Sequence, residues 1–320
     1  MAKVFAMFVV NRDGLTLFSR NLAPGKIHPD LVTSFLTAIR SLVGEISPSE
    51  AGGLRSIEAQ DFTILVEPGE KVFGALLIDH EDAIARGCLK AMVREFERRY
   101  GRFLEDWDGD VSLFEPFGEI CDRILSVIAL SSYHVPKIGG WAEGDVRIPR
   151  DLWYIMRLID GRKTIAEIAR EAGLGVEETM ERTKRLLEMG LIDVDVVEPV
   201  RFVVSTFEEA LNRYLLRLRE LLGIKLTSKI LSSAMERWGR DLLAQRPDGR
   251  VSASDVDRIA WLHLPGEVYR MLDELLDLLC QEAAPILGRL AMRLKSEVRD
   301  ELLTRHKEDL LRFQAIGGGR

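Results

Sequence analysis

Long apolar runs are missing from this sequence. Its longest apolar stretches, such as Phe5 to Val10, have the length of a strand, whereas a membrane-spanning helix needs about 20 residues. The first residues read Met-Ala-Lys and lead directly into that strand, so we expect no signal peptide. The sequence therefore predicts a protein without a transmembrane segment.

Cysteine is also scarce, with 3 in 320 residues. Cys88, Cys121 and Cys280 lie far apart and form no C-x-x-C pair, which argues against a disulfide framework or a zinc ribbon. Isolated cysteines of this kind suit the reducing cytoplasm, and we interpret them as core residues. We predict a cytoplasmic protein.

Side-chain amides are few as well. There are three Asn and four Gln beside 33 Arg and 11 Lys. Few thermolabile amides combined with many charged residues are typical of proteins from thermophiles, although a GC-rich genome also raises the share of Arg. The composition predicts a thermophilic source or a GC-rich one.

An overall basic charge is absent. The net charge of −7 excludes a protein that coats nucleic acid through a broadly basic surface, but it leaves room for one basic face. Apolar residues make up 47% of the chain and charged residues 30%, as in soluble globular proteins. A length of 320 residues predicts two or three domains.

No motif for catalysis, a cofactor or a metal is present. Gly161 to Thr164 departs from a phosphate-binding loop, because Arg162 separates the Gly from the Lys and a helical pattern precedes it. The acidic run from Asp106 to Asp110 has its Gly at the fourth position instead of the sixth position of a calcium loop, so we expect an acidic turn. The five histidines share no ligand spacing. We predict a protein that is not an enzyme and that holds no cofactor or metal.

The first 130 residues alternate between strand and helix signals. Two strands at 4–10 and 15–19 flank an Asn-Arg-Asp-Gly turn, and three further strands lie near 54–59, 62–67 and 72–78. The expected helices span Pro29 to about Val43, a segment from an N-cap at Asp79 (with Asp82 as its N3 partner) to about Tyr100, and roughly 113–130. We predict an α+β fold, in which three helices pack on a five-stranded antiparallel sheet.

This element order, together with the opening hairpin from Val4 to Arg20, resembles the longin domain family of the roadblock/longin superfamily. The resemblance covers about two fifths of the chain; profilin-like folds are architectural relatives, and a PAS-like sensor is a competing interpretation. The longin resemblance implies binding to a small Ras-like GTPase or to another longin or roadblock domain, with homodimers or heterodimers. The candidate surface is a sheet edge with the first helix, around Leu31 to Leu42.

A segment rich in Gly, Ser and Pro at 132–144 separates this part (1–131) from the next (145–200). It also holds Tyr133, Val135 and Trp141, so we expect it to dock against a domain and not to hang free. Residues 145–200 read as three helices followed by a strand from Gly190, and the stretch from Ile159 to Ile192 resembles a winged helix-turn-helix. The β-branched stretch at 194–202 should add further wing strand.

The charges of that module leave two functions open. A DNA reader would use Thr179, Arg182, Lys184 and Arg185 on its recognition helix. The first turns of that helix also hold three Glu, and 145–195 contains nine basic against eleven acidic residues. Such a module lacks the main attraction for phosphates, which favours protein interaction over nucleic-acid binding.

From 201 to 314 the pattern predicts an all-α bundle, and 315–320 a disordered tail. One stripe runs from Leu211 to Leu222; another runs from Leu272 through Ile286 and Leu290 to Leu294, with a break near Pro285. These stripes suit a bundle core, and a homodimer seam is the alternative. Taken together, the sequence predicts a cytoplasmic adaptor, with a DNA-binding transcription regulator that senses a ligand through its N-terminal domain as the alternative.

Overall fold

The structure, a computed structural model, describes residues 2–23, 32, 34, 37–38, 55–105, 107–127, 129–139 and 146–316. The chain forms two compact units. The first unit contains Met1–Leu130, Pro136–Arg162 and Ile168–Val194, and the second contains Ser131–Val135, Lys163–Glu167 and Asp195–Arg320. The division into domains at 1–131, 145–200 and 201–314 stays a prediction.

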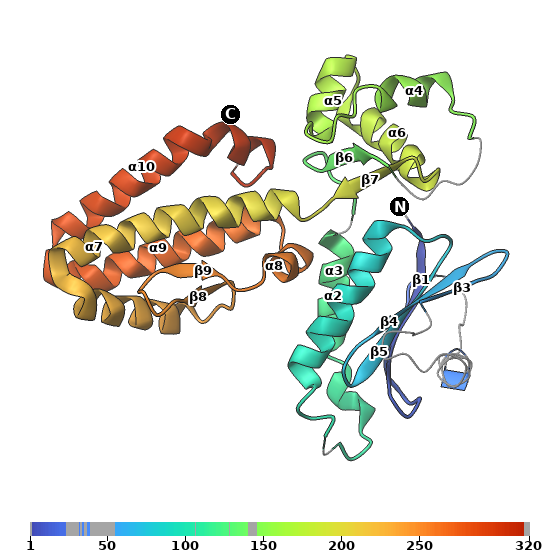
Figure 1. Cartoon of the computed structure of the whole chain (residues 1–320), viewed down its shortest axis with the longest axis horizontal. Coiled ribbons are helices and arrows are strands. Elements are labelled where there is room, and N and C mark those ends of the chain that lie inside the picture. Colours follow the sequence, from blue (N-terminus) through green and yellow to red (C-terminus); the bar gives the residue numbers. More distant parts are fainter. Residues whose placement is uncertain are drawn as a thin grey trace. The chain divides into compact units, whose positions relative to one another are not determined.

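A five-stranded antiparallel sheet forms the centre of the N-terminal part (Figure 1), which we call the sheet domain. Its strands are β1 (Val4–Asn11), β2 (Thr16–Asn21), β3 (Ser56–Glu58), β4 (Thr63–Pro68) and β5 (Val72–Ile78). They lie in the order β2-β1-β5-β4-β3, and every neighbouring pair is antiparallel. The predicted α+β class and five-stranded sheet are confirmed.

The central strands are buried on both faces. On one face Phe8 of β1, Val66 of β4 and Phe73 of β5 belong to a single apolar cluster, against which Val32 packs. On the other face Gly74 lies against Leu89 and Val93, where an added Cβ would come within 2.9 Å of both side chains. Burial on both faces explains why these strands read as nearly continuous apolar runs without polar alternation.

Helix α2 (Ala83–Tyr100) begins at a different cap from the one predicted. Asp82 is the N-cap, in an extended conformation, and its carboxylate accepts from the Ala85 N–H at 2.6 Å. Asp79 instead accepts from the Lys3 N–H at 2.7 Å and so fastens the loop to the residue that precedes β1. The predicted N-cap at Asp79 is therefore wrong by three residues, because the backbone turns into the helix only after Asp82.

The predicted helix at 113–130 is two shorter elements, a 3₁₀ turn η1 (Val111–Phe114) and helix α3 (Phe117–Val127). Asp110 caps η1 by accepting from the Ser112 N–H at 2.9 Å, as an acidic turn should. Behind the turn, an aromatic cluster fills the space between sheet and helices with ring centroids about 5–6 Å apart. Its members are Phe18, Phe96, Tyr100, Phe114 and Phe117. The predicted first helix lies outside the described residues, apart from helical Val32, Ser34, Thr37 and Ala38.

Three short helices follow, namely α4 (Arg150–Met156), α5 (Ile165–Ala172) and α6 (Val176–Glu188), with a two-stranded sheet of β6 (Val135–Ile138) and β7 (Ile192–Asp195). A capping box begins α5, since the Thr164 hydroxyl accepts from the Glu167 N–H at 3.3 Å and the Glu167 carboxylate accepts from the Thr164 N–H at 2.7 Å. The expected wing strand over 194–202 is wrong beyond β7, because a helix begins at Glu198.

The first part of the predicted linker is docked. Tyr133 and Val135 are buried, and the Ile165 N–H donates to the His134 carbonyl at 3.0 Å. Ile138, within β6, is exposed, and Trp141 lies outside the described residues. Docking is thus confirmed for the start of the linker.

The C-terminal helical part contains α7 (Glu198–Trp238), α8 (Val256–Leu262), α9 (Pro265–Leu287) and α10 (Arg289–Arg312). It is not all-α as predicted, because a hairpin of β8 (Leu243–Gln245) and β9 (Val251–Ala253) lies between α7 and α8. The N-cap of α8 is Asp255, whose carboxylate accepts from the Arg258 N–H at 3.0 Å. The break predicted near Pro285 occurs at Gly288, whose φ of 56° ends α9.

Candidate functional site

The four residues predicted for a DNA-reading face do not form one exposed basic surface. Thr179 is fully buried and its hydroxyl donates to the Gly175 carbonyl at 3.0 Å, so it faces the interior of the module. Arg182, Lys184 and Arg185 reach the surface, but each lies beside a carboxylate. Their partners are Glu178 at 2.5 Å, Glu188 at 4.0 Å and Asp151 at 3.6 Å, respectively.

A concave site that the sequence did not indicate lies in the helical part, at a bend within α7. Gly223 has φ 77° and ψ 169°, a conformation that only glycine adopts readily, and it divides the 41-residue helix into two arms. The Thr227 hydroxyl donates to the Gly223 carbonyl at 2.9 Å and stabilises the start of the second arm. We call this bend the elbow.

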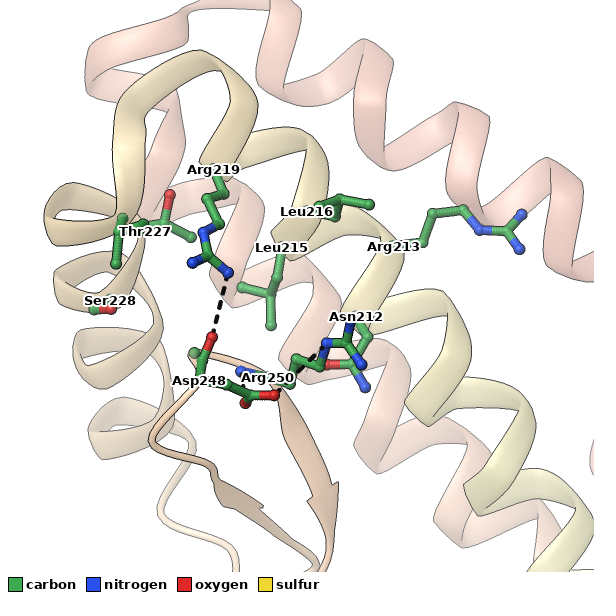
Figure 2. Close-up of a pocket in the computed structure, with 11 residues that line it drawn as sticks. Asn212, Arg213, Leu215, Leu216, Arg219, Thr227, Ser228, Asp248 and Arg250 are labelled. Atoms are coloured by element: carbon green, nitrogen blue, oxygen red, sulfur yellow. Dashed lines mark hydrogen bonds and ion pairs between the residues drawn. The ribbon is translucent and has the colours of Figure 1, made fainter.

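The elbow and the tip of the β8–β9 hairpin enclose a cavity of about 240 Å³ (Figure 2). The turn at Asp248 closes the hairpin because its carboxylate accepts from the Arg250 N–H at 3.1 Å. Asn212 holds the hairpin against the first arm, donating to the Val251 carbonyl at 2.9 Å and accepting from the Val251 N–H at 2.8 Å. The cavity is therefore built by polar contacts between elements about 40 residues apart in the chain.

Arginine side chains give the cavity its charge. Arg219 points toward the hairpin and donates to the Asp248 carbonyl at 3.4 Å, and the Arg250 guanidinium lies 3.8 Å from the Asp248 carboxylate. Arg213 extends away from the hairpin in Figure 2. A hydrogen bond to Glu301 raises the pKa of Arg213.

The arrangement can attract an anionic group but offers little for chemistry on it. Arg219 donates to a carbonyl and no carboxylate partner is recorded for it among the described residues, so its charge is available to a ligand. Leu215, Leu216 and Ile224 give the rest of the lining an apolar character. A guanidinium, hydroxyls and aliphatic walls suit binding, whereas a nucleophile needs an adjacent base.

The cysteines occupy sites that oppose reactivity. Cys88 and Cys121 are fully buried, and burial raises the pKa of both thiols far above neutral pH. A thiol held protonated is a poor nucleophile and a poor metal ligand. In the part of the chain that the structure describes, no cluster of His, Cys, Asp or Glu could hold a metal ion, and no helix could cross a membrane.

The cavity could not be predicted from the sequence, because the elements that form it have weak local sequence signals. The hairpin strands have three residues each, below the length at which alternation is informative, although the Pro247-Asp-Gly turn is visible. Gly223 stands inside a leucine-rich helical pattern, and a single internal Gly there does not by itself indicate a bend.

Comparisons with known proteins show a similarity to solved structures. No protein-family model matches the chain, and no curated protein matches it. Among solved structures, the chain is similar to a Roadblock/LC7 domain from Streptomyces avermitilis, with 23% sequence identity and a TM-score of 0.26, over 31% of this chain and 87% of that one. A similarity at this TM-score assigns no function to the chain.

Proposed function

We propose that this chain is a non-enzymatic adaptor whose sheet domain binds a small Ras-like GTPase or another longin or roadblock domain. The observation that carries the proposal is the open sheet, whose order β2-β1-β5-β4-β3 ends in two edge strands. An edge strand presents a row of backbone donors and acceptors to which a partner strand can pair. The resemblance of the opening hairpin and element order to longin domains implies partners of this class.

Of the two edges, β3 is the better candidate. On β2 the Arg20 side chain pairs with Asp122 of α3 at 2.6 Å, so α3 lies close to that edge. β3 pairs with β4 over Ser56 to Glu58, and the flanking Ala59 N–H donates inward to Phe62. Because backbone groups alternate in direction along a strand, the N–H of Glu58 points outward. Glu58 itself is exposed, so a partner strand can reach this edge.

The features of the three-helix module favour protein contact over DNA. If α4 to α6 form the predicted winged helix, α6 is its recognition helix, and its first turn carries Glu177 and Glu178. Glu178 also neutralises Arg182, and Thr179 is buried. Phosphates would meet carboxylates at the position where a DNA reader places cations. The DNA-binding alternative is therefore the weaker hypothesis.

The experiment uses the full chain and purified small GTPases from the source genome, each loaded with GDP or a GTP analogue. We expect binding that depends on the nucleotide and that Glu58→Pro weakens at least tenfold, since proline removes the outward N–H. Glu58→Ala is the matched control, because it removes the carboxylate and keeps the N–H. Equal binding by both variants would contradict edge pairing. No binding to any GTPase, and no self-association in light scattering, would refute the adaptor function.

A further inference from the structure

One end of the helical part has an unusual surface composition. Two turns meet there, the elbow of α7 (residues 216–229) and the connection from α9 to α10 (residues 284–293), and Figure 1 shows both at the same end of this part. Contacts on the approach to both turns agree with this placement. The Tyr214 hydroxyl lies 3.5 Å from the Ala291 carbonyl, and Ser233 donates to Glu282 at 2.9 Å. We call these two turns the elbow end.

Large aliphatic side chains are exposed on both turns. Six of them have 39–58% of their surface accessible, although the helices that carry them have a well-filled core. They are Leu216, Leu221, Ile224, Ile286, Leu290 and Met292. The predicted leucine stripe therefore leaves the core at Ile286 and Leu290, which is a correction to the sequence analysis. Clustered exposed apolar groups usually indicate a binding surface.

The charge at the elbow end is opposite to that of the whole chain. Its two turns contain six basic residues and a single acidic one, Glu220, in a protein of net charge −7. Two of the six cations are paired locally, Arg217 with Glu220 and Arg293 with Glu297. The other four are exposed, and no carboxylate partner is recorded for them in the described part of the chain. These four are Arg219, Lys225, Lys229 and Arg289.

We propose that the elbow end binds the surface of a membrane that contains anionic lipid. Exposed aliphatic side chains can enter the boundary between headgroups and acyl chains while neighbouring Lys and Arg contact anionic headgroups, and stable attachment needs both contributions. The acidic remainder of the chain is repelled by such a surface, so only this end faces it. The adjacent cavity, which Arg219 also lines, adds Arg250, with the Asp248 carboxylate as the opposing charge.

A second copy of the chain is a poorer occupant. In a symmetric dimer this surface would face itself, so the unpaired cations would meet cations. A bilayer instead offers a hydrocarbon region to the apolar side chains of both turns, and its anionic headgroups offer negative charge to the neighbouring cations. The proposal is independent of the proposed function, because it concerns the helical part and leaves the edge strand β3 unused.

The test is sedimentation of the full chain with vesicles of phosphatidylcholine containing about 30% phosphatidylglycerol, compared with phosphatidylcholine alone. We expect binding to the anionic vesicles only, weakened severalfold when the salt concentration rises from about 0.1 M to about 0.5 M. The triple variant Lys225→Glu, Lys229→Glu, Arg289→Glu should lower the partition coefficient more than tenfold. The double variant Ile224→Asp, Leu290→Asp keeps every Lys and Arg of the elbow end and should lower the partition coefficient about tenfold.

The matched control is Lys90→Glu, Arg94→Glu, Lys307→Glu, which makes the same change in net charge at exposed positions that belong to neither of the two turns. It should keep most of the binding. All variants must retain the circular dichroism spectrum and elution volume of the native chain. Three outcomes overturn the proposal: no binding to anionic vesicles, equal loss in the control and the triple variant, or self-association that Ile224→Asp abolishes.

Discussion

The sheet domain and the helical part both expose large apolar side chains, but the charged residues near these side chains differ. In the sheet domain these residues are scattered over separate turns, and most of them stand near a carboxylate in the sequence: Leu15 follows Asp13, Phe62 follows Asp61, and Phe103 lies between Arg102 and Glu105. At the elbow end they are gathered on two turns with unpaired cations. The difference teaches that exposure alone does not identify a binding surface. The sign of the neighbouring charge separates the two regions.

The interiors differ as well. The sheet domain is held by strands buried on both faces and by an aromatic cluster around Phe96. The helical part relies on α7, α9 and α10, whose core is mainly aliphatic and also contains Phe207, Tyr214, Trp238 and Tyr269. Ion pairs lie at its margin, such as Arg299 with Asp273 at 2.7 Å. If the two cores are independent, a substitution in one should leave the other unchanged.

The largest expected effect is in the sheet domain. Phe96 is fully buried and lies within 5.3 Å, between ring centroids, of Tyr100, Phe114 and Phe117. Phe96→Ala should lower the free energy of unfolding of this domain by roughly 3–5 kcal/mol, because it removes buried surface and leaves a cavity. Hydrogen exchange should report the loss in β1 and β5 and not in α9. The matched control is Phe103→Ala, which is 56% exposed and should change stability little. Equal losses in α9 would show a shared core.

A pH effect comes next and concerns the second unit. Burial lowers the pKa of His134 from 6.5 to about 4, while the Asp195 carboxylate opposes this shift. The unfolded state therefore binds more protons than the folded state between these pH values, so stability falls as the pH drops below about 6.5, and the loss is complete near pH 4. The difference between the folded and unfolded pKa of His134 corresponds to a loss of roughly 3 kcal/mol in the free energy of unfolding.

Denaturant unfolding of the native chain and of His134→Gln at several pH values measures this pH dependence of the free energy of unfolding. Glutamine cannot titrate, and its carbonyl can replace Nδ1 as acceptor for the Ser131 N–H, which lies at 3.2 Å. The variant should lack the additional loss between pH 6.5 and 4, whereas His306→Gln should retain it. Parallel pH profiles for native chain and His134→Gln would refute the assignment.

Features with short-range causes were predictable from the sequence. The strand β5 follows from a run of apolar residues that ends at the Asp79 turn, and the capping box from Thr164 and Glu167 at three-residue spacing. Caps and turns depend on a few neighbouring residues, so their signal is local. The cap at Asp82 was missed because Asp79 offers the same local pattern three residues earlier.

Features with long-range causes were not predictable. Thr179 was assigned to a DNA-reading face, yet it is buried, because helix packing and not the residue type decides which side of α6 faces inward. The elbow end joins two turns about 60 residues apart, and neither turn is unusual by itself. Their proximity comes from the packing of α7 against α9 and α10, which no local pattern encodes.

The elbow offers a smaller effect than His134 and tests backbone strain alone. An added Cβ at Gly223 meets no atom within 4 Å, but its φ is 77°, so Gly223→Ala should destabilise the helical part by about 1–3 kcal/mol through conformation. Gly175→Ala is the comparison variant: its Cβ also meets open space and its φ is −65°, so it carries no φ strain, and its cost is limited to replacing the N-cap glycine of α6. Thermal unfolding of both variants checks this. If Gly223→Ala unfolds at the same midpoint temperature as the native chain, the bend relaxes when Gly223 is replaced.

The smallest effect is expected at the capping box of α5. Thr164 is buried, and Thr164→Ala leaves the Glu167 N–H without its side-chain acceptor, so we expect a loss of about 1 kcal/mol, whereas Thr164→Ser should be close to neutral. Burial acts to raise the pKa of Glu167, but hydrogen bonds from Thr164 and from Arg312 of α10, at 2.9 Å, outweigh it and lower that pKa. The Glu167 contribution is therefore present above its unfolded pKa and is lost as the pH falls through the lower folded pKa.

Because Glu167 joins the first turn of α5 to the last turn of α10 inside the second unit, the loss should spread beyond α5. Hydrogen exchange in Thr164→Ala should rise in both the first turn of α5 and the last turn of α10, while β1 and β5 of the sheet domain keep their protection. A rise confined to α5 would show that the cap acts locally and that the Arg312 ion pair adds nothing measurable, as many exposed pairs do. The stability of α10 would then not depend on α5. The sheet domain and the helical part would differ only in the charges beside their exposed apolar side chains.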